Sequence, residues 1–157
     1  MTWNEAFPYT FKNLRKKFNI PEPSKLGMVE QCRADDSDLC QEMTSEPFSL
    51  TDSQVHHAAS RYHLGKSRSG KTIYWMIDEL GNCHDGHIGT NSHAADTWVS
   101  QMLKHRYPEL ASYIKVSHCL FGLHLTREVG GVAIVEKERS AVILSELYPQ
   151  SLWLATA

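Results

Sequence analysis

The C-terminal end of the chain carries the pattern that most restricts its fold. Val132–Val135 is a short apolar run, Lys137–Tyr148 has apolar residues at helical spacing, and Ser151–Thr156 is a second apolar run. A strand, a crossover helix and a second strand form a βαβ unit with parallel strands and a right-handed connection. Glu136 then stands at the carboxyl end of the first strand, the edge where open α/β sheets bind ligands. We therefore predict a βαβ unit with Glu136 as its candidate functional residue.

The middle of the chain predicts two helices and a β-hairpin. Thr51-Asp-Ser-Gln54 is a capping box, which satisfies free backbone N–H groups where a helix begins. Further on, Ile73–Ile77 has the β-branched and aromatic composition of a strand, and the turn residues after it let the chain return. The expected ranges are 52–61 and 96–106 for the helices and 73–77 and 83–89 for the strands.

The N-terminal part is less regular. Phe11–Phe18 has apolar residues on one helical face and basic residues elsewhere, which predicts a short helix. Glu22–Pro47 has little periodicity, and its acidic cluster at 35–38 lacks the calcium-loop pattern, so we expect an irregular linker.

These elements predict an α+β fold, in which N-terminal helices and a hairpin-containing sheet lead into the C-terminal βαβ unit. The expected segments are residues 1–47 as a helix and irregular linker, 48–129 as a hairpin-containing α+β domain, and 130–157 as the βαβ unit.

Composition restricts the environment and the partners. The net charge of -2 argues against a protein whose whole surface binds nucleic acid or anionic lipid. No stretch approaches the roughly 20 apolar residues of a membrane span, and no secretory signal is recognisable. The four cysteines have irregular spacing, which indicates free thiols. We therefore expect a cytoplasmic protein without a membrane partner, while the oligomeric state is not indicated.

Gly65–Thr72 matches the phosphate-loop signature G-x-x-x-x-G-K-[ST] in full. That signature binds phosphate only where a strand enters the loop and a helix leaves it, because the helix N-terminus supplies the N–H groups. Here the tail of a capped helix precedes the motif and a strand follows it. A nucleotide-hydrolysing enzyme that uses Gly65–Thr72 is therefore an alternative, not the main interpretation.

Histidine and cysteine are dense around the hairpin, at Cys83, His84, His87 and His93. Strand side chains alternate, so His84 and His87 are expected on opposite faces of the sheet. The chain also has no C-x-x-C pair to anchor a zinc site. We therefore predict no metal ligands.

Gly130–Ile143, with the sequence GGVAIVEKERSAVI, resembles the opening strand and helix of a Toprim domain, the module shared by bacterial primases and topoisomerases. The preceding part is similar to an uncharacterised domain that lies directly ahead of a Toprim-like unit in primase-related proteins of bacterial mobile elements. The similarity extends from about Phe48 to the end of the chain, and in that family Gly65–Thr72 corresponds to a variable loop. The matching segments are Arg61–Gly65, Thr72–Asp78, Asp85–Ile88, Trp98–Val99 and His118–Gly122.

The resemblance implies that Glu136 is the acid or base of phosphoryl transfer. A Toprim site also uses an Asp-x-Asp pair on a later strand to hold divalent metal, and no such pair follows Glu136 here. Asp36 and Asp38 lie in the wrong place to substitute. The Toprim portion is thus expected to be partial and truncated, and Mg²⁺ is expected only in a completed site.

Together these observations predict a truncated or accessory Toprim- and primase-related protein of a mobile element. We expect it to act in DNA replication or mobilisation through DNA or a partner protein, without being catalytically complete alone. The candidate DNA contacts are Lys66, Arg68 and Lys71, and the candidate catalytic residue is Glu136. Two further alternatives are a metal-dependent nucleotidyl or phosphoryl transferase that obtains its missing acids elsewhere, and a non-catalytic interaction domain.

Overall fold

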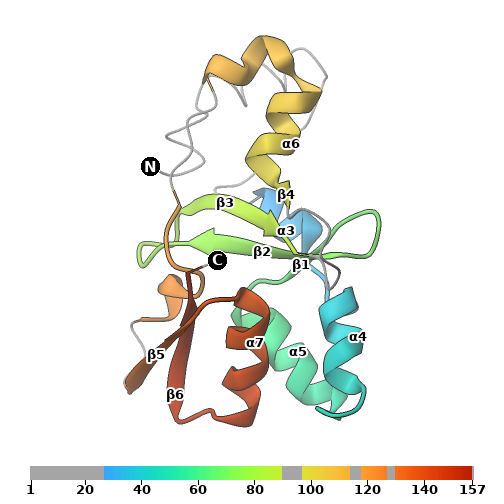
Figure 1. Ribbon diagram of the computed structural model, residues 1–157, viewed down its shortest axis with the longest axis vertical. Coiled ribbons are helices and arrows are strands. Elements are labelled where there is room, and N and C mark those ends of the chain that lie inside the picture. The colour runs from blue at the N-terminus through green and yellow to red at the C-terminus, as the bar shows by residue number, and fades with distance from the viewer. Residues whose placement is uncertain (1–26, 90–96, 114–117, 127–129, 157) are drawn as a thin grey trace.

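The computed structural model describes residues 27–89, 97–113, 118–126 and 130–156, and the helix predicted over Phe11–Phe18 lies outside these ranges. The described part is an α+β fold with a four-stranded and a two-stranded sheet (Figure 1). In chain order the elements are α3 (Gly27–Cys32), α4 (Asp38–Thr44), α5 (Asp52–Arg61), β1 (Gly65–Lys66), β2 (Thr72–Ile77), β3 (Cys83–Ile88), β4 (Thr97–Trp98), α6 (Val99–Arg106), η1 (Pro108–Tyr113), η2 (Leu123–Leu125), β5 (Gly131–Val135), α7 (Glu138–Leu147) and β6 (Ser151–Ala155).

The four-stranded sheet is antiparallel, in the order β1-β2-β3-β4, and its centre is the predicted hairpin. The register pairs Ile73 with Ile88 and Ile77 with Cys83. Every residue of β2 is buried because the sheet is covered on both faces. Alternate residues Ile73, Trp75 and Ile77 pack with α3 and α6, whereas Tyr74 and Met76 join the main core.

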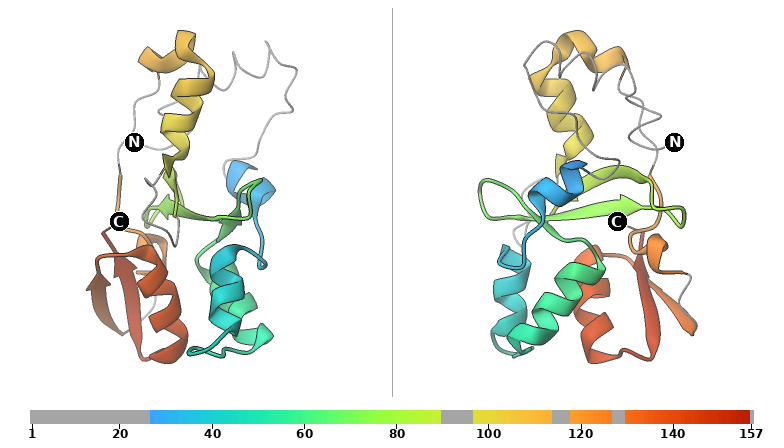
Figure 2. Two further views of the ribbon diagram at one scale, coloured as in Figure 1. Left: turned by 45° about the vertical axis from the view of Figure 1, so that its right-hand side comes forward. Right: turned by 180° about the vertical axis from the view of Figure 1, so that it is seen from behind.

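Different helices lie on the two sides of the four-stranded sheet. In Figures 1 and 2, α6 and η1 extend from one side, while α4, α5, α7 and the parallel strands lie on the other. The main core lies on that second side and includes residues of α4, α5, α7 and β6. Residues from all three predicted segments pack into it, so the boundaries at 47 and 129 do not separate packing units.

The C-terminal βαβ unit is confirmed. β5 and β6 pair in parallel, from Gly131 opposite Ser151 to Val135 opposite Ala155, and α7 connects them. The apolar composition of β5 does not reflect burial, because Val132 is 55% exposed and Ile134 is 57% exposed. On β6, by contrast, Leu152 and Leu154 are buried.

The expectation of an irregular linker over Glu22–Pro47 is wrong for its described part, which contains α3 and α4. Both helices are short, and the N-cap Ser37 of α4 makes no side-chain capping bond. Helices of this length depend on tertiary packing more than on propensity. Leu39, Cys40 and Met43 of α4 supply that packing, because all three are buried in the main core.

The capping box of α5 is confirmed in full. The Thr51 hydroxyl accepts the Gln54 N–H at 3.2 Å, and the Gln54 side chain accepts the Thr51 N–H at 3.0 Å. The next predicted helix begins at Val99, after the short strand β4, and ends at Arg106 before Pro108.

The segment around Phe121 contacts both β6 and the main core. Phe121 forms an antiparallel bridge with Ala155, and its ring stacks on Tyr62 of the main core. The Tyr62 hydroxyl donates to the Trp153 carbonyl at 2.8 Å. β6 is therefore paired with β5 on one side and with the Phe121 segment on the other.

None of the helices in the described part of the chain is both long enough and apolar enough to cross a membrane.

Candidate functional site

Glu136 lies at the carboxyl end of β5, as predicted. The carboxyl ends of β5 and β6 are the ends of the parallel pair nearest the four-stranded sheet (Figures 1 and 2). The residue is exposed, and the Thr156 hydroxyl donates to its backbone carbonyl at 3.3 Å. The carboxylate therefore stands at the edge that ligands use in open α/β sheets.

The described residues do not form the magnesium site of a completed Toprim domain. Among them, no group of three or more His, Cys, Asp or Glu side chains is placed to hold a metal ion. Glu136 is a single exposed carboxylate, and Mg²⁺ needs an octahedral set of oxygen ligands.

The three candidate DNA contacts lie in one loop, between β1 and β2. Arg68 is exposed and Lys71 is partly exposed, but the Lys66 ammonium pairs with the Asp36 carboxylate at 2.8 Å. Figures 1 and 2 show this loop away from the parallel strands, so the structure does not bring it to Glu136. Arg68 and Lys71 are the more available cations of the loop.

The phosphate-loop motif forms a turn between antiparallel strands. β1 contains its first two residues, and Thr72 begins β2, so no helix N-terminus follows the loop. The Thr72 hydroxyl is already bound, 2.5 Å from Asp38 Oδ1 and 2.8 Å from Ser37 Oγ. The geometry therefore does not support the phosphate-loop alternative.

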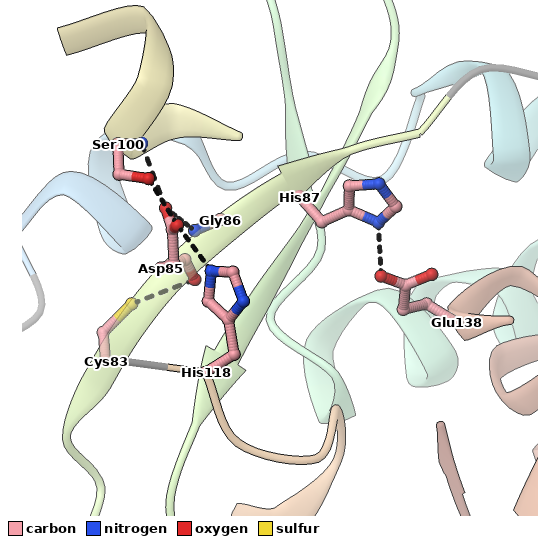
Figure 3. A network of polar contacts seen from close by, with 7 residues as sticks. All are labelled: Cys83, Asp85, Gly86, His87, Ser100, His118 and Glu138. Atoms are coloured by element: carbon pink, nitrogen blue, oxygen red, sulfur yellow. Dashed lines mark hydrogen bonds and ion pairs between the residues drawn. The ribbon is translucent and has the colours of Figure 1, made fainter. Parts of the chain in front are cut away.

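A buried polar network connects β3, α6 and the segment at His118 (Figure 3). Asp85 is completely buried, and its carboxylate accepts the Gly86 N–H at 2.8 Å, the Ser100 N–H at 3.0 Å and the Ser100 hydroxyl at 2.6 Å. The Ser100 N–H belongs to the first turn of α6. Asp85 therefore caps this helix from a neighbouring strand, where the helix dipole favours a negative charge.

His118 completes this network. Its Nε2 lies 3.0 Å from Asp85 Oδ2, and its side chain remains 47% exposed. The imidazole stacks on Trp98, with ring centroids 3.9 Å apart and planes inclined by 16°. The contact with Asp85 and the stack on Trp98 therefore hold this partly exposed imidazole in one orientation.

On the same face of β3, His87 contacts the first residue of α7. Its Nδ1 binds Glu138 Oε1, and both side chains are almost fully buried. Trp98 lies opposite His87 in the register and stacks on its ring at 4.6 Å. The neighbouring His84 instead binds Asp78 at 2.8 Å, so His84 and His87 have different partners.

Sequence reasoning assigned no role to Asp85, His87, Ser100, His118 or Glu138. The partners of these contacts are separated by 15, 33 and 51 residues. The available signal was the alternation that places two polar residues, Asp85 and His87, on one face of β3, where both are buried. Such alternation marks one face of a strand but does not identify the distant partners.

A family model described as a domain of unknown function, DUF6371, matches residues 37–157. The chain belongs to the DUF6371 family. The matched range contains Glu136, the β1–β2 loop and the whole Asp85 network, and it begins at the residue before α4. The searches of curated proteins and of solved structures found no match. The DUF6371 description names neither Toprim nor primase.

Proposed function

We propose that the protein is an accessory protein of the Toprim and primase type, which acts in DNA replication or in the mobilisation of a mobile element. The observation that carries this proposal is the exposed Glu136 at the carboxyl end of β5, within a parallel β5–α7–β6 unit. This is the placement that the Toprim resemblance implies for its functional glutamate.

DNA is the proposed direct partner, and Arg68 and Lys71 are its proposed contacts. The net charge of -2 means that binding depends on a local positive region. The turn of the β1–β2 loop provides such a positive region, because it presents Arg68 and Lys71. Lys66 contributes less positive charge there, because it is paired with Asp36. Partner proteins of replication or mobilisation are the second proposed class of contact.

The test is fluorescence anisotropy with labelled single-stranded and double-stranded DNA over a salt series. The purified chain should bind with an affinity that falls as salt rises, because each neutralised phosphate contributes about 0.7 to 0.9 to the log–log slope. The double variant Arg68→Ala/Lys71→Ala should reduce that slope by about 1.5. Lys104→Ala/Arg106→Ala removes the same charge from the exposed end of α6 and should leave the slope unchanged.

Three results would contradict the proposal in different ways. Absence of salt-sensitive binding removes DNA as the direct partner. Equal effects of the two double variants remove the loop as the contact. Mg²⁺-dependent DNA cleavage by the purified chain, abolished in Glu136→Gln, removes the accessory role and makes the chain a complete enzyme.

A further inference from the structure

Strand β5 is the longest open sheet edge in the described part of the chain. Among these residues it pairs with β6 alone, and Figures 1 and 2 show it at the outer edge of the molecule. The four-stranded sheet instead ends in β1 and β4, which have two residues each, and Arg33 bridges to β1 at Gly65. Phe121 bridges the outer edge of β6. The five-residue edge of β5 therefore offers the longest row of backbone groups to another strand.

The sequence of β5 lacks the features that protect such an edge. Proteins normally prevent pairing with another chain by charged side chains, proline or a bulge at an edge strand. Gly131–Val135 has the sequence GVAIV, without charge or proline, and its register against β6 is regular from end to end. The strand is therefore suited to accept a further strand through backbone hydrogen bonds.

Val132 and Ile134 extend this edge with apolar side chains. They lie on one face of the strand, because strand side chains alternate, and both are more than half exposed. Leu152 and Leu154, which pair with them on β6, are buried. Since β-branched side chains stabilise a sheet through cross-strand contacts, an added strand fits this edge best with apolar residues opposite Val132 and Ile134.

We propose that the free edge of β5 binds the β5 strand of a second copy of the chain, in an antiparallel register centred on Ala133. A twofold axis through this residue gives one continuous sheet in the order β6-β5-β5-β6. Val132 of each copy then lies opposite Ile134 of the other copy, on the same face. On the other face, Gly131 lies opposite Val135 and Ala133 lies opposite its own counterpart. The strand is thus complementary to itself.

Charge favours a second copy in this register. Glu136, the charged residue next to the strand, falls opposite Gly130, so no like charges face each other within residues 130–136. A register centred on Ile134 would instead place Glu136 opposite the apolar Val132. A partner strand with charged residues would likewise leave an unpaired charge beside Val132 and Ile134. The net charge of -2 per copy adds only weak repulsion between two copies.

The size of the edge determines how strong the dimer is. A strand of five residues spans about 17 Å, so pairing of the edge buries less than the roughly 800 Å² per partner of a standard interface. Interfaces below that size are weak, so the dimer should form at high protein concentration and dissociate on dilution. Because Phe121 bridges the far edge of β6, the assembly should contain two copies and grow no further.

Sedimentation velocity of the full chain, from about 1 µM to about 1 mM, tests the proposal. The measured mass should rise twofold over that range. Val132→Lys/Ile134→Lys should keep the chain monomeric, because it places like charges directly opposite each other across the axis. Leu80→Lys/Met102→Lys is the matched control, since it also replaces two exposed apolar side chains and should dimerise as the original chain does.

Val132→Lys/Ile134→Glu tests the register. In the antiparallel pairing centred on Ala133, the lysine introduced in each copy lies opposite the glutamate introduced in the other. This variant should therefore dimerise at least about tenfold more tightly than Val132→Lys/Ile134→Lys. Both variants lose the same apolar side chains, so apolar contact does not account for the difference. Circular dichroism reports whether each variant is folded.

A chain that stays monomeric up to the highest concentration would overturn the proposal. A dimer that the Leu80/Met102 variant weakens as much as the Lys/Lys variant of β5 would overturn the assignment to this edge. Equal dissociation constants for the two β5 variants would overturn the register, and species larger than two copies would overturn the closure at the dimer. None of these measurements uses DNA, so the nucleic-acid proposal is tested separately.

Discussion

His87 of β3 and Glu138 of α7 join the two sheets through a contact between Nδ1 and Oε1 in the protein interior. The exposed fractions of the two side chains are 6% and 3%. Glu138 lies two residues after Glu136, so the loop that carries Glu136 is anchored to the antiparallel sheet. The position of Glu136 therefore depends on a buried polar contact with His87, which lies outside the βαβ unit.

His87→Ala should lower the free energy of unfolding by about 3 kcal/mol, because it leaves the buried Glu138 carboxylate without this partner and opens a cavity beside Trp98. Urea denaturation measures the loss. His56→Ala is the control, since it removes an exposed His–Asp pair and should cost much less stability. Equal losses would show that the buried contact does not join the sheets.

Thr51→Ala should cost about 1 kcal/mol of stability, because the Gln54 N–H loses its acceptor at the start of α5. Ser53→Ala changes an exposed residue in the same helical turn and should have an effect within about 0.5 kcal/mol. Thermal unfolding of both variants makes the comparison. A smaller loss in Thr51→Ala than in Ser53→Ala would contradict the capping role.

Gly86→Ala should destabilise the fold by about 1 to 3 kcal/mol, because a Cβ there would approach the Trp75 ring at 2.7 Å and Val99 at 2.8 Å. Gly131→Ala is the matched strand control. A Cβ at Gly131 meets nothing within 4 Å, so this variant should be neutral or slightly more stable. Equal unfolding midpoints for the two variants would refute the close packing of β3 on Trp75.

Asp78 should make stability sensitive to acid. Burial alone would raise the pKa of its carboxyl, but hydrogen bonds from His84 and from the Asn82 and Leu80 N–H groups outweigh that effect and lower the pKa. A depressed folded pKa adds stability above the unfolded value, near 3.9, and that stability is lost as pH falls through the folded value. The stability difference between the original chain and Asp78→Asn should therefore shrink below about pH 4. A difference that stays constant with pH would contradict the linkage.

The elements predicted from sequence are those with strong local patterns. The Ile73–Ile77 strand, the capping box at Thr51 and the βαβ unit each depend on residues close together in the chain. α4 was missed because it is only seven residues long and has no side-chain cap, so its stability comes from burial of Leu39 and Met43 against distant elements. Local patterns carry no record of such packing.

The residues of the candidate site also differ in whether local sequence patterns could predict them. The position of Glu136 could be predicted, because the βαβ pattern places it at the carboxyl end of a strand, the edge at which open α/β sheets bind ligands. The Asp85 network could not be predicted, because Asp85, Ser100 and His118 come from three separate segments of the chain that tertiary folding brings together. The phosphate-loop match is the converse case, since a complete motif at Gly65–Thr72 lies in a turn without the helix that its chemistry requires.

The pairing of β6 on both sides also determines how the protein responds to mechanical force. Ala155 exchanges backbone hydrogen bonds with Phe121, the Thr156 N–H donates to the Val135 carbonyl, and Tyr62 binds the Trp153 carbonyl. A pull on the C-terminus along β6 therefore loads the bonds to both neighbours in shear at the same time. Withdrawal of this one strand would therefore remove Leu152 and Leu154 from the main core.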